Sequence, residues 1–363
     1  MTDLFSPVTI GDYQLKNRII MAPLTRARSL IGAVPMAELK AEYYSQRASA
    51  GLIIAEATAV SKTGLGWLDT SGMWNDEQQA AWAKVTRAVH DKNGKIFIQL
   101  WHMGAAVTTD FLDGQLPISS SNVNLSGEIR TPTGRKQALS EPRPIKLEDI
   151  PDVQQEYVDA AIRAIAAGFD GVEIHAANGF LIDQFTRDGS NKRQDEYGGS
   201  IDNRIRFALE IVDKTVQAIG AGKVGIRISP TNKVWGINDS NYRATFSRLV
   251  EKLNGFNLAY LHVLEPKPDS GHPMETIDYL TPELRSIYQG NLIANGGYTK
   301  ASGDKAIATG AADGIAFGIP FIANPDLVER FKVGGELATP DQETFYTNDA
   351  IGYTDYPSMN ATA

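Results

Sequence analysis

The sequence contains no cysteine among its 363 residues. This absence excludes disulfides, thiolate metal sites, iron–sulfur clusters and thiol nucleophiles. The sequence also lacks any run of about 18 apolar residues and any basic start followed by an apolar stretch. Basic residues are in the minority, with 35 Lys and Arg against 43 Asp and Glu, for a net charge of −8. We therefore expect a cytoplasmic protein with no nucleic-acid or membrane partner.

What the sequence does contain is eight short apolar runs, each followed by an amphipathic stretch of helical length. The runs are continuous rather than alternating, which is typical of parallel strands buried on both faces. The runs span 19–23, 52–58, 95–102, 171–178, 224–230, 258–265, 291–297 and 314–318, and the helical stretches include 36–50, 76–92, 153–167, 203–219, 242–253 and 300–309. This alternation predicts the α/β class and a single (β/α)8 TIM barrel over 1–363, with its chemistry at the carboxyl ends of the strands.

Three segments fall outside the repeat. The opening VTIGDYQL predicts an N-terminal β-hairpin that turns at Gly11 and Asp12 and plugs the barrel. A stretch rich in Ser, Thr, Pro and Gly, 103–148, follows the third strand. So long a loop is usually functional, and we interpret it as a lid insertion, with a plain surface insertion as the alternative. Residues 330–363 form a C-terminal tail.

Two motif-like features do not lead to a site. The glycines of 220–225 match the dinucleotide pattern G-x-G-x-x-G, but they follow a helix and precede a strand. Pyrophosphate binding requires the reverse order, so we interpret them as a helix stop. His102, His175, His262, Glu56 and Glu265 could nominally bind a metal, yet no H-E-x-x-H or Asp-rich spacing occurs and we predict no metal.

The polar residues at the strand ends indicate a flat, phosphorylated ligand. Gln99 offers a donor and an acceptor, and Arg227 offers a planar fork of donors. Glycine-rich 295–299 and Gly318 follow the seventh and eighth strands, where such barrels commonly bind phosphate. Flavin mononucleotide (FMN) meets these requirements, although two glycine loops alone could be ordinary tight turns.

Long phrases of the sequence make the indication specific. LKNRIIMAPLTRAR, YYSQRASAGLIIAEAT, IFIQLWHMG, GVEIHAANGFLIDQFTRDGSNKRQDEYGGSIDNR, GIRISP, NGGYT, FIANPDL and GYTDYP occur in this order. Over essentially the whole chain the sequence resembles the old yellow enzyme family of FMN-dependent ene-reductases. The resemblance implies non-covalent FMN, with NADPH or NADH as the hydride-donating substrate. It also implies ping-pong reduction of the C=C bond of α,β-unsaturated carbonyls, maleimides or nitroalkenes.

The same resemblance implies roles for individual residues. His175 and Asn178 would donate hydrogen bonds to the substrate carbonyl, which makes its conjugated β-carbon electrophilic. With Thr25, which would tune the flavin, they form the expected catalytic set. The expected FMN contacts are Pro23, Thr25, Ala57, Gln99, Arg227, Gly297, Gly318 and the position of Ile319, and Trp67, Trp101 and Tyr346 are expected to line the substrate pocket with His175 and Asn178.

Two positions depart from the family pattern. Phe180 stands where the family usually has a proton-donating Tyr, so water or a hydroxyl such as that of Tyr346 is expected to supply the proton. Ile319 stands where an Arg commonly contacts the phosphate, which predicts looser FMN retention. The sequence leaves open the physiological alkene, the nicotinamide preference, the stereochemistry and whether the protein is a monomer or a homodimer.

Other functions remain as alternatives at this stage. One is a different FMN barrel dehydrogenase, for which only His175 is well placed as a base. Another is a metal-dependent barrel hydrolase or aldolase, although no Lys ends a strand as a Schiff-base candidate. A third is a flavin-binding protein without enzymatic activity.

Overall fold

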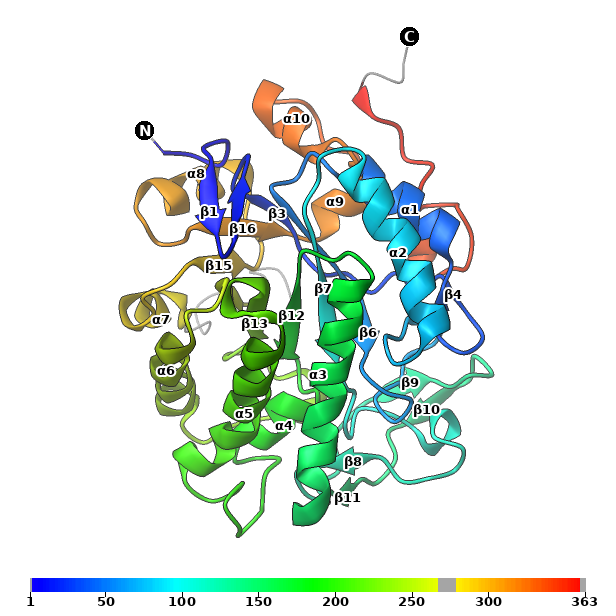
Figure 1. Ribbon diagram of the computed structural model, residues 1–363, viewed down its shortest axis with the longest axis vertical. Helices are drawn as coiled ribbons and strands as arrows, with labels where there is room; N and C mark the ends of the chain where they lie inside the picture. Colours follow the sequence, from blue (N-terminus) through cyan, green and yellow to red (C-terminus); the bar gives the residue numbers. More distant parts are fainter. Residues whose placement is uncertain (1, 267–278, 360–363) are drawn as a thin grey trace.

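Eight parallel strands close into a barrel in the computed structural model, which describes residues 2–266 and 279–359. The last strand of the chain pairs with the first, so the sheet has no edge (Figure 1). In chain order the strands are β3 (Ile19–Met21), β6 (Leu52–Ala59), β7 (Ile96–Trp101), β12 (Gly171–Ala176), β13 (Val224–Ile228), β14 (Tyr260–Leu264), β15 (Leu292–Asn295) and β16 (Gly314–Phe317). The predicted barrel and its eight strands are confirmed.

The barrel is buried on both faces because its strands are apolar on both. Outward residues such as Ile98, Val172 and Ile226 belong to the large core shared with the helices. Inward residues such as Ile54 and Phe97 form a separate core inside the barrel. This two-sided burial is the reason that the strand sequences are continuous apolar runs.

Helices surround the barrel (Figure 1). Six were predicted, and they span α1 (Ala37–Gln46), α2 (Asp76–His90), α3 (Ile150–Ala166), α5 (Ile201–Ile219), α6 (Tyr242–Leu253) and α8 (Lys300–Ala308). Four shorter helices were given no bounds from the sequence: α4 (Leu181–Thr186), α7 (Thr281–Ile287), α9 (Ile319–Ala323) and α10 (Leu327–Val333). Each has seven residues or fewer. Two turns or less are too few to reveal a helical period in the sequence.

The N-terminal strands β1 (Val8–Ile10) and β2 (Tyr13–Leu15) pair antiparallel around Gly11 and Asp12. Their side chains Ile10 and Leu15 are buried in the same cluster as the inward residues of the barrel. The hairpin therefore closes one end of the barrel interior. The glycines of 220–225 lie beside the hairpin, where the N–H of Asp12 donates to the carbonyl of Gly222 (3.2 Å). Gly220 ends α5 with a φ of +91°, and the chain then enters β13.

The long insertion contains several short strands. β8 (Ile118–Ser119) pairs parallel with β11 (Arg143–Pro144), and β9 (Glu128–Arg130) pairs antiparallel with β10 (Lys136–Ala138). Its movement as a lid stays a prediction. Another hairpin, β4 (Ser29–Leu30) with β5 (Val34–Pro35), precedes α1.

The C-terminal tail packs back onto the barrel. The buried guanidinium of Arg26 donates to the carbonyl of Gly352 (2.7 Å), and Arg28 donates to that of Thr344 (3.0 Å). The ring of Tyr353 stacks on Tyr43, with 3.9 Å between centroids. These contacts bring the tail over the carboxyl ends of the first strands. In the described ranges 2–266 and 279–359, no helix is both long and apolar enough to cross a bilayer.

Candidate functional site

A cavity of about 350 Å³ lies at the carboxyl ends of the barrel strands. Eleven of the thirteen positions expected from the sequence line it: Pro23, Thr25, Ala57, Trp67, Gln99, Trp101, His175, Asn178, Arg227, Ile319 and Tyr346. The remaining two, Gly297 and Gly318, are not part of this lining and follow the neighbouring strands β15 and β16. Residues as far apart in the chain as Pro23 and Arg227 thus meet because every strand of the barrel ends at the same face.

The floor of the cavity is a polar layer inside the barrel. Gln99 Nε2 donates to Glu173 Oε1 (2.7 Å), and His262 Nδ1 contacts the other oxygen of Glu173 (2.8 Å). Because the Gln99 amide nitrogen is used below, its oxygen is available to a ligand above. Burial lowers the pKa of His262, although the Glu173 carboxylate opposes this shift.

Arg227 provides the positive charge of the floor. Its Nη2 donates to Asn295 Oδ1 (2.8 Å), and the Asn295 amide donates in turn to the carbonyl of Ala316 (2.7 Å). Its Nε is buried with no partner among the described residues. A buried guanidinium with an unused donor in a cavity fits a ligand that brings acceptor atoms, such as the pyrimidine edge of a flavin. The floor residues therefore fit FMN.

His175 forms one wall of the cavity. It is 3% exposed, and its ring packs against both Trp101 (6.3 Å between centroids) and Phe180 (5.0 Å), which also contact each other. Its Nδ1 is buried without a partner among the described residues. Burial, and next the charge of Arg227, hold the pKa of His175 well below its ordinary value. The imidazole is therefore neutral and can donate one hydrogen bond to a ligand without carrying charge.

Asn178 completes the wall beside His175. It follows β12 with a φ of +58°, a left-handed conformation that Asn tolerates better than most residues. Its backbone N–H donates to Ser229 Oγ (2.8 Å) in the loop after β13. The neighbouring strand ends thus fix the backbone that carries the Asn178 side chain.

A buried ion pair lies behind the Pro23–Thr25 segment of the cavity. Lys40 Nζ contacts Glu56, and both side chains have 0% exposure. Lys40 also donates to the carbonyl of Ala27 (2.6 Å). Glu56 precedes the cavity residue Ala57, so the pair connects two parts of the cavity wall.

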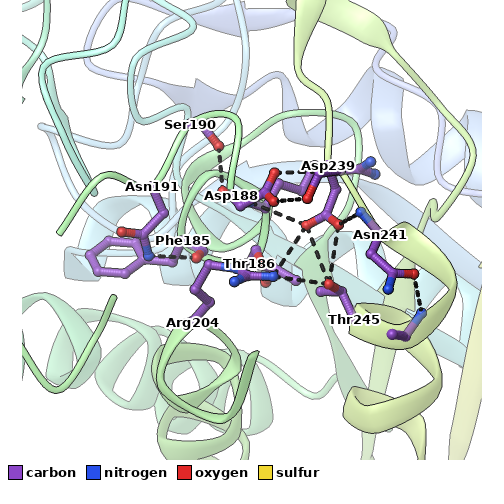
Figure 2. Close-up of polar contacts among 12 residues, drawn as sticks. Phe185, Thr186, Asp188, Ser190, Asn191, Arg204, Asp239, Asn241 and Thr245 are labelled. Carbon is purple, nitrogen blue, oxygen red and sulfur yellow. Dashed lines mark hydrogen bonds and ion pairs between the residues drawn. The ribbon is translucent and has the colours of Figure 1, made fainter. Parts of the chain in front are cut away.

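A polar cluster outside the cavity lining joins Asp188, Arg204, Asp239, Asn241 and Thr245 (Figure 2). The Asp239 carboxylate accepts from the backbone N–H groups of Asp188 (3.2 Å) and Asn241 (2.8 Å), and it contacts the Arg204 guanidinium at 3.5 Å. Arg204 also donates to Thr245 Oγ1 (3.0 Å). The cluster ties the loop after α4 to the start of α6, so the loops that follow β12 and β13 are held together.

His102, at the end of β7, is buried but does not line the cavity. Its Nδ1 accepts from the N–H of Gly104 (3.0 Å), and burial lowers its pKa to about 3. The residue therefore stays neutral in the folded protein and gains a proton near pH 6.5 when unfolded. No three His, Asp or Glu side chains within residues 2–266 and 279–359 are grouped so that they could hold a metal ion.

This difference in pKa predicts a loss of stability in mild acid. Because the unfolded chain binds the proton and the folded chain does not, stability falls as the pH drops below 6.5. One such proton costs about 1.4 kcal/mol per pH unit, or about 2 kcal/mol between pH 6.5 and pH 5. Urea unfolding at both values should show a smaller fall for His102→Gln than for the wild type. An equal fall in the two proteins would contradict the prediction.

Sequence reasoning missed part of the wall. Leu24, Arg26, Ile322 and Phe345 also line the cavity, with Phe180 at the position where the family usually has a Tyr. Leu24 and Arg26 flank the expected Thr25 after β3, and Ile322 lies on α9, three residues after the expected Ile319. Phe345 is on the tail and follows no barrel strand, so no strand-end signal could identify it, because only the packing of the tail brings it to the cavity.

Comparison with known proteins gives concordant matches over the whole chain. Residues 3–337 match the model of the NADH:flavin oxidoreductase / NADH oxidase family. Putative 12-oxophytodienoate reductase 11 of Oryza sativa subsp. japonica is 44% identical over 98% of this chain and 97% of its own. The old yellow enzyme homologue from Zymomonas mobilis has a TM-score of 0.95 and 43% identity, covering 98% of this chain and 99% of its own. Morphinone reductase in complex with tetrahydroNAD has a TM-score of 0.92 and 42% identity, covering 99% and 98%.

Proposed function

Because this chain belongs to the NADH:flavin oxidoreductase / NADH oxidase family, within which it is an old yellow enzyme-type ene-reductase, we propose that His175 and Asn178 bind the carbonyl of its alkene substrate. The enzyme is an FMN-dependent NAD(P)H:alkene oxidoreductase. Donors from two side chains stabilise the negative charge that develops on the carbonyl oxygen when a hydride reaches the β-carbon. The buried, unpartnered Nδ1 of His175 supports this role.

The FMN ring would lie on the polar floor of the cavity. Arg227 and the oxygen of Gln99 would hold its pyrimidine end, Pro23, Thr25 and Ala57 would contact the ring, and Gly297 and Gly318 would approach the phosphate. When bound, FMN supplies a carrier that accepts hydride from a reduced nicotinamide and gives hydride to an alkene. The Arg227 charge would favour the reduced carrier, because negative charge collects at that end.

The substrate class follows from the walls above the floor. Trp67, Trp101 and Tyr346 contribute aromatic surface, and His175 and Asn178 contribute the polar groups. Such a pocket fits a flat, mostly apolar ring with one carbonyl. Cyclic enones are therefore the proposed substrates, with maleimides and nitroalkenes as other alkenes of matching electrophilicity. The names of the relatives, 12-oxophytodienoate reductases and morphinone reductase, are consistent with ring ketones.

The observation that carries this proposal is the convergence of eleven expected positions on one cavity. The test is spectroscopic. The purified protein should be yellow, should bleach anaerobically on addition of NADPH, and should recover its colour on addition of cyclohex-2-enone. A flavin dehydrogenase without ene-reductase activity would bleach and not recover, and a protein that stays colourless after incubation with FMN would overturn the proposal.

The proton for the α-carbon would come from water or from Tyr346, because Phe180 has no acidic hydrogen. The Phe180 ring packs edge-on against Trp101, 4.8 Å between centroids, beside His175. We expect Phe180→Tyr to speed alkene turnover about 10-fold or more, since a positioned general acid commonly contributes 10²-fold or above. Steady-state turnover of cyclohex-2-enone, followed as NADPH oxidation, measures this. An unchanged rate would show that protonation at this position does not limit turnover.

We expect weak retention of FMN because Ile319 stands where the family commonly has a phosphate-binding Arg. Ile319 is the first residue of α9, lines the cavity and is 47% exposed. Ile319→Arg should lower the Kd for FMN about 10-fold, because a charge-assisted hydrogen bond to phosphate is worth about 1.5–3 kcal/mol. Flavin release on dilution measures this, with Val333→Arg, which adds the same charge at an exposed position of α10, as the control. If both variants retain FMN as the wild type does, main-chain N–H groups already suffice.

A further inference from the structure

Asn232 lies in the loop after β13, next to the end of β12, and is not part of the cavity lining. Its Nδ2 donates to the Oδ1 of the wall residue Asn178 at 2.9 Å. The contact therefore engages the back of the side chain whose front is proposed to bind the substrate carbonyl.

The direction of this hydrogen bond decides which end of the Asn178 amide faces the cavity. The backbone N–H of Val234 donates to Asn232 Oδ1 at 3.2 Å. A backbone N–H can only donate, so the Asn232 atom beside it must be the oxygen and the atom beside Asn178 must be the NH2 group. Asn178 consequently presents its oxygen to Asn232. Its NH2 group, for which the structure records no hydrogen bond within residues 2–266 and 279–359, is left for a ligand.

The loop around Asn232 is held in place from two sides. The backbone N–H of Ser126, in the long insertion, donates to the carbonyl of Trp235 at 2.8 Å. The Trp235 ring packs so closely over Gly179 that a Cβ atom there would come within 2.9 Å of it. On the other side, the buried Arg187 donates to the carbonyl of Ser229 at 2.7 Å. The loop is thus anchored to the insertion and to the segment after β12.

We propose that Asn232 is a positioning residue that fixes the amide orientation of Asn178, so that an N–H donor and not a carbonyl oxygen faces the substrate. The proposal rests on the proposed function of Asn178. A free amide can rotate by 180° and present its oxygen, which repels a substrate carbonyl. Holding the amide in one orientation raises the population that is competent to bind.

Two substitutions separate this role from a merely structural one. Asn232→Ala removes the restraint and should raise the Kd for a carbonyl ligand about 3- to 10-fold, the effect of one neutral hydrogen bond. Asn232→Asp keeps the shape and can still accept from Val234. Its second oxygen can only accept, so the Asn178 amide must turn its NH2 group toward residue 232 and its oxygen toward the cavity. Asn232→Asp should therefore bind more weakly than Asn232→Ala, about 10-fold or more below the wild type.

The probe is cyclohexanone, which has the carbonyl but no alkene, so binding is measured without turnover. The holoenzyme is titrated and the change in flavin absorbance gives the Kd. Lys233→Glu controls for added negative charge, because it places a carboxylate in the same loop at an exposed position. The same Asn232→Asp change in an Asn178→Gly background should alter the Kd less than about 2-fold, because the amide that it reorients is absent. Flavin content and thermal unfolding establish that each variant is folded.

The outcomes separate the positioning role of Asn232 from the proposed function of Asn178. Weaker binding in the order wild type, Asn232→Ala, Asn232→Asp, with Lys233→Glu unchanged, supports the proposal. If Asn178→Gly weakens binding but Asn232→Asp binds as well as Asn232→Ala or better, the positioning role is overturned and the function of Asn178 stands. If Asn178→Gly itself binds cyclohexanone like the wild type, the proposed function of Asn178 fails.

Discussion

His175→Ala is expected to slow the transfer of hydride to an enone by about 10²- to 10³-fold, the usual effect of removing one preorganised donor to a developing oxyanion. The large effect is expected because the surroundings of His175 hold its donor in place. The His175 residue is 3% exposed, and its neutral ring packs against the rings of Trp101 and Phe180, so its free donor is fixed before the substrate arrives. Water that replaces the imidazole has no such fixed position.

The measurement separates the two half-reactions. The enzyme is first reduced anaerobically with NADPH and then mixed with cyclohex-2-enone in a stopped-flow instrument, and flavin content is checked beforehand. Asn178→Gly should give a comparable loss, and glycine adopts the φ of +58° at this position without strain. His90→Ala is the matched control, because His90 lies at the end of α2 and its partner Asp170 is outside the cavity. An enone step within 3-fold of the wild type in His175→Ala would contradict the assigned role.

Lys40→Met is expected to destabilise the protein by about 3–5 kcal/mol, because it leaves the Glu56 carboxylate buried without its cation. Both side chains are fully buried. The same change should speed FMN release. Lys40 donates to the carbonyl of Ala27, and the other carboxylate oxygen of its partner Glu56 accepts from the backbone N–H of Arg26 (3.4 Å). Loss of Lys40 removes the first of these bonds and leaves Glu56 without its cation, so the segment that carries Thr25 is held less firmly.

Equilibrium unfolding in urea measures the first effect, and flavin fluorescence on dilution measures the second. The control is Lys84→Met, which breaks the ion pair between Lys84 and Glu38. The Lys84 side chain is 61% exposed and the Glu38 side chain is 81% exposed. It should change stability by less than about 1 kcal/mol, because solvent screens an exposed pair. Lys40→Met with Glu56→Gln should recover part of the loss, since the unpaired charge is gone. A cost below about 1 kcal/mol for Lys40→Met alone would contradict the prediction.

Only part of the polar layer under the cavity could be predicted. Gln99 and Arg227 were expected because each lies at a strand end and is polar in an apolar run. Glu173 lies in the same strand as His175, two residues earlier, and therefore on the same inward face. Its partner His262 comes from β14, and nothing in either strand indicates the other. The pairing depends on the stagger of strands in the closed barrel, which is a property of the whole sheet.

Local order in the chain was enough to predict the barrel, the family and most of the cavity residues. Each of these depends on local order: an apolar run is buried wherever it lies, and its last residues lie at the carboxyl face of any such barrel. Tertiary packing sets which side chains meet across that face. It brought Phe345 of the tail to the cavity and set Asn232 behind Asn178. Such contacts depend on how separate loops pack and on which end of an amide faces a neighbour, and hydrogen-bond geometry between distant segments leaves no periodic signal in the chain.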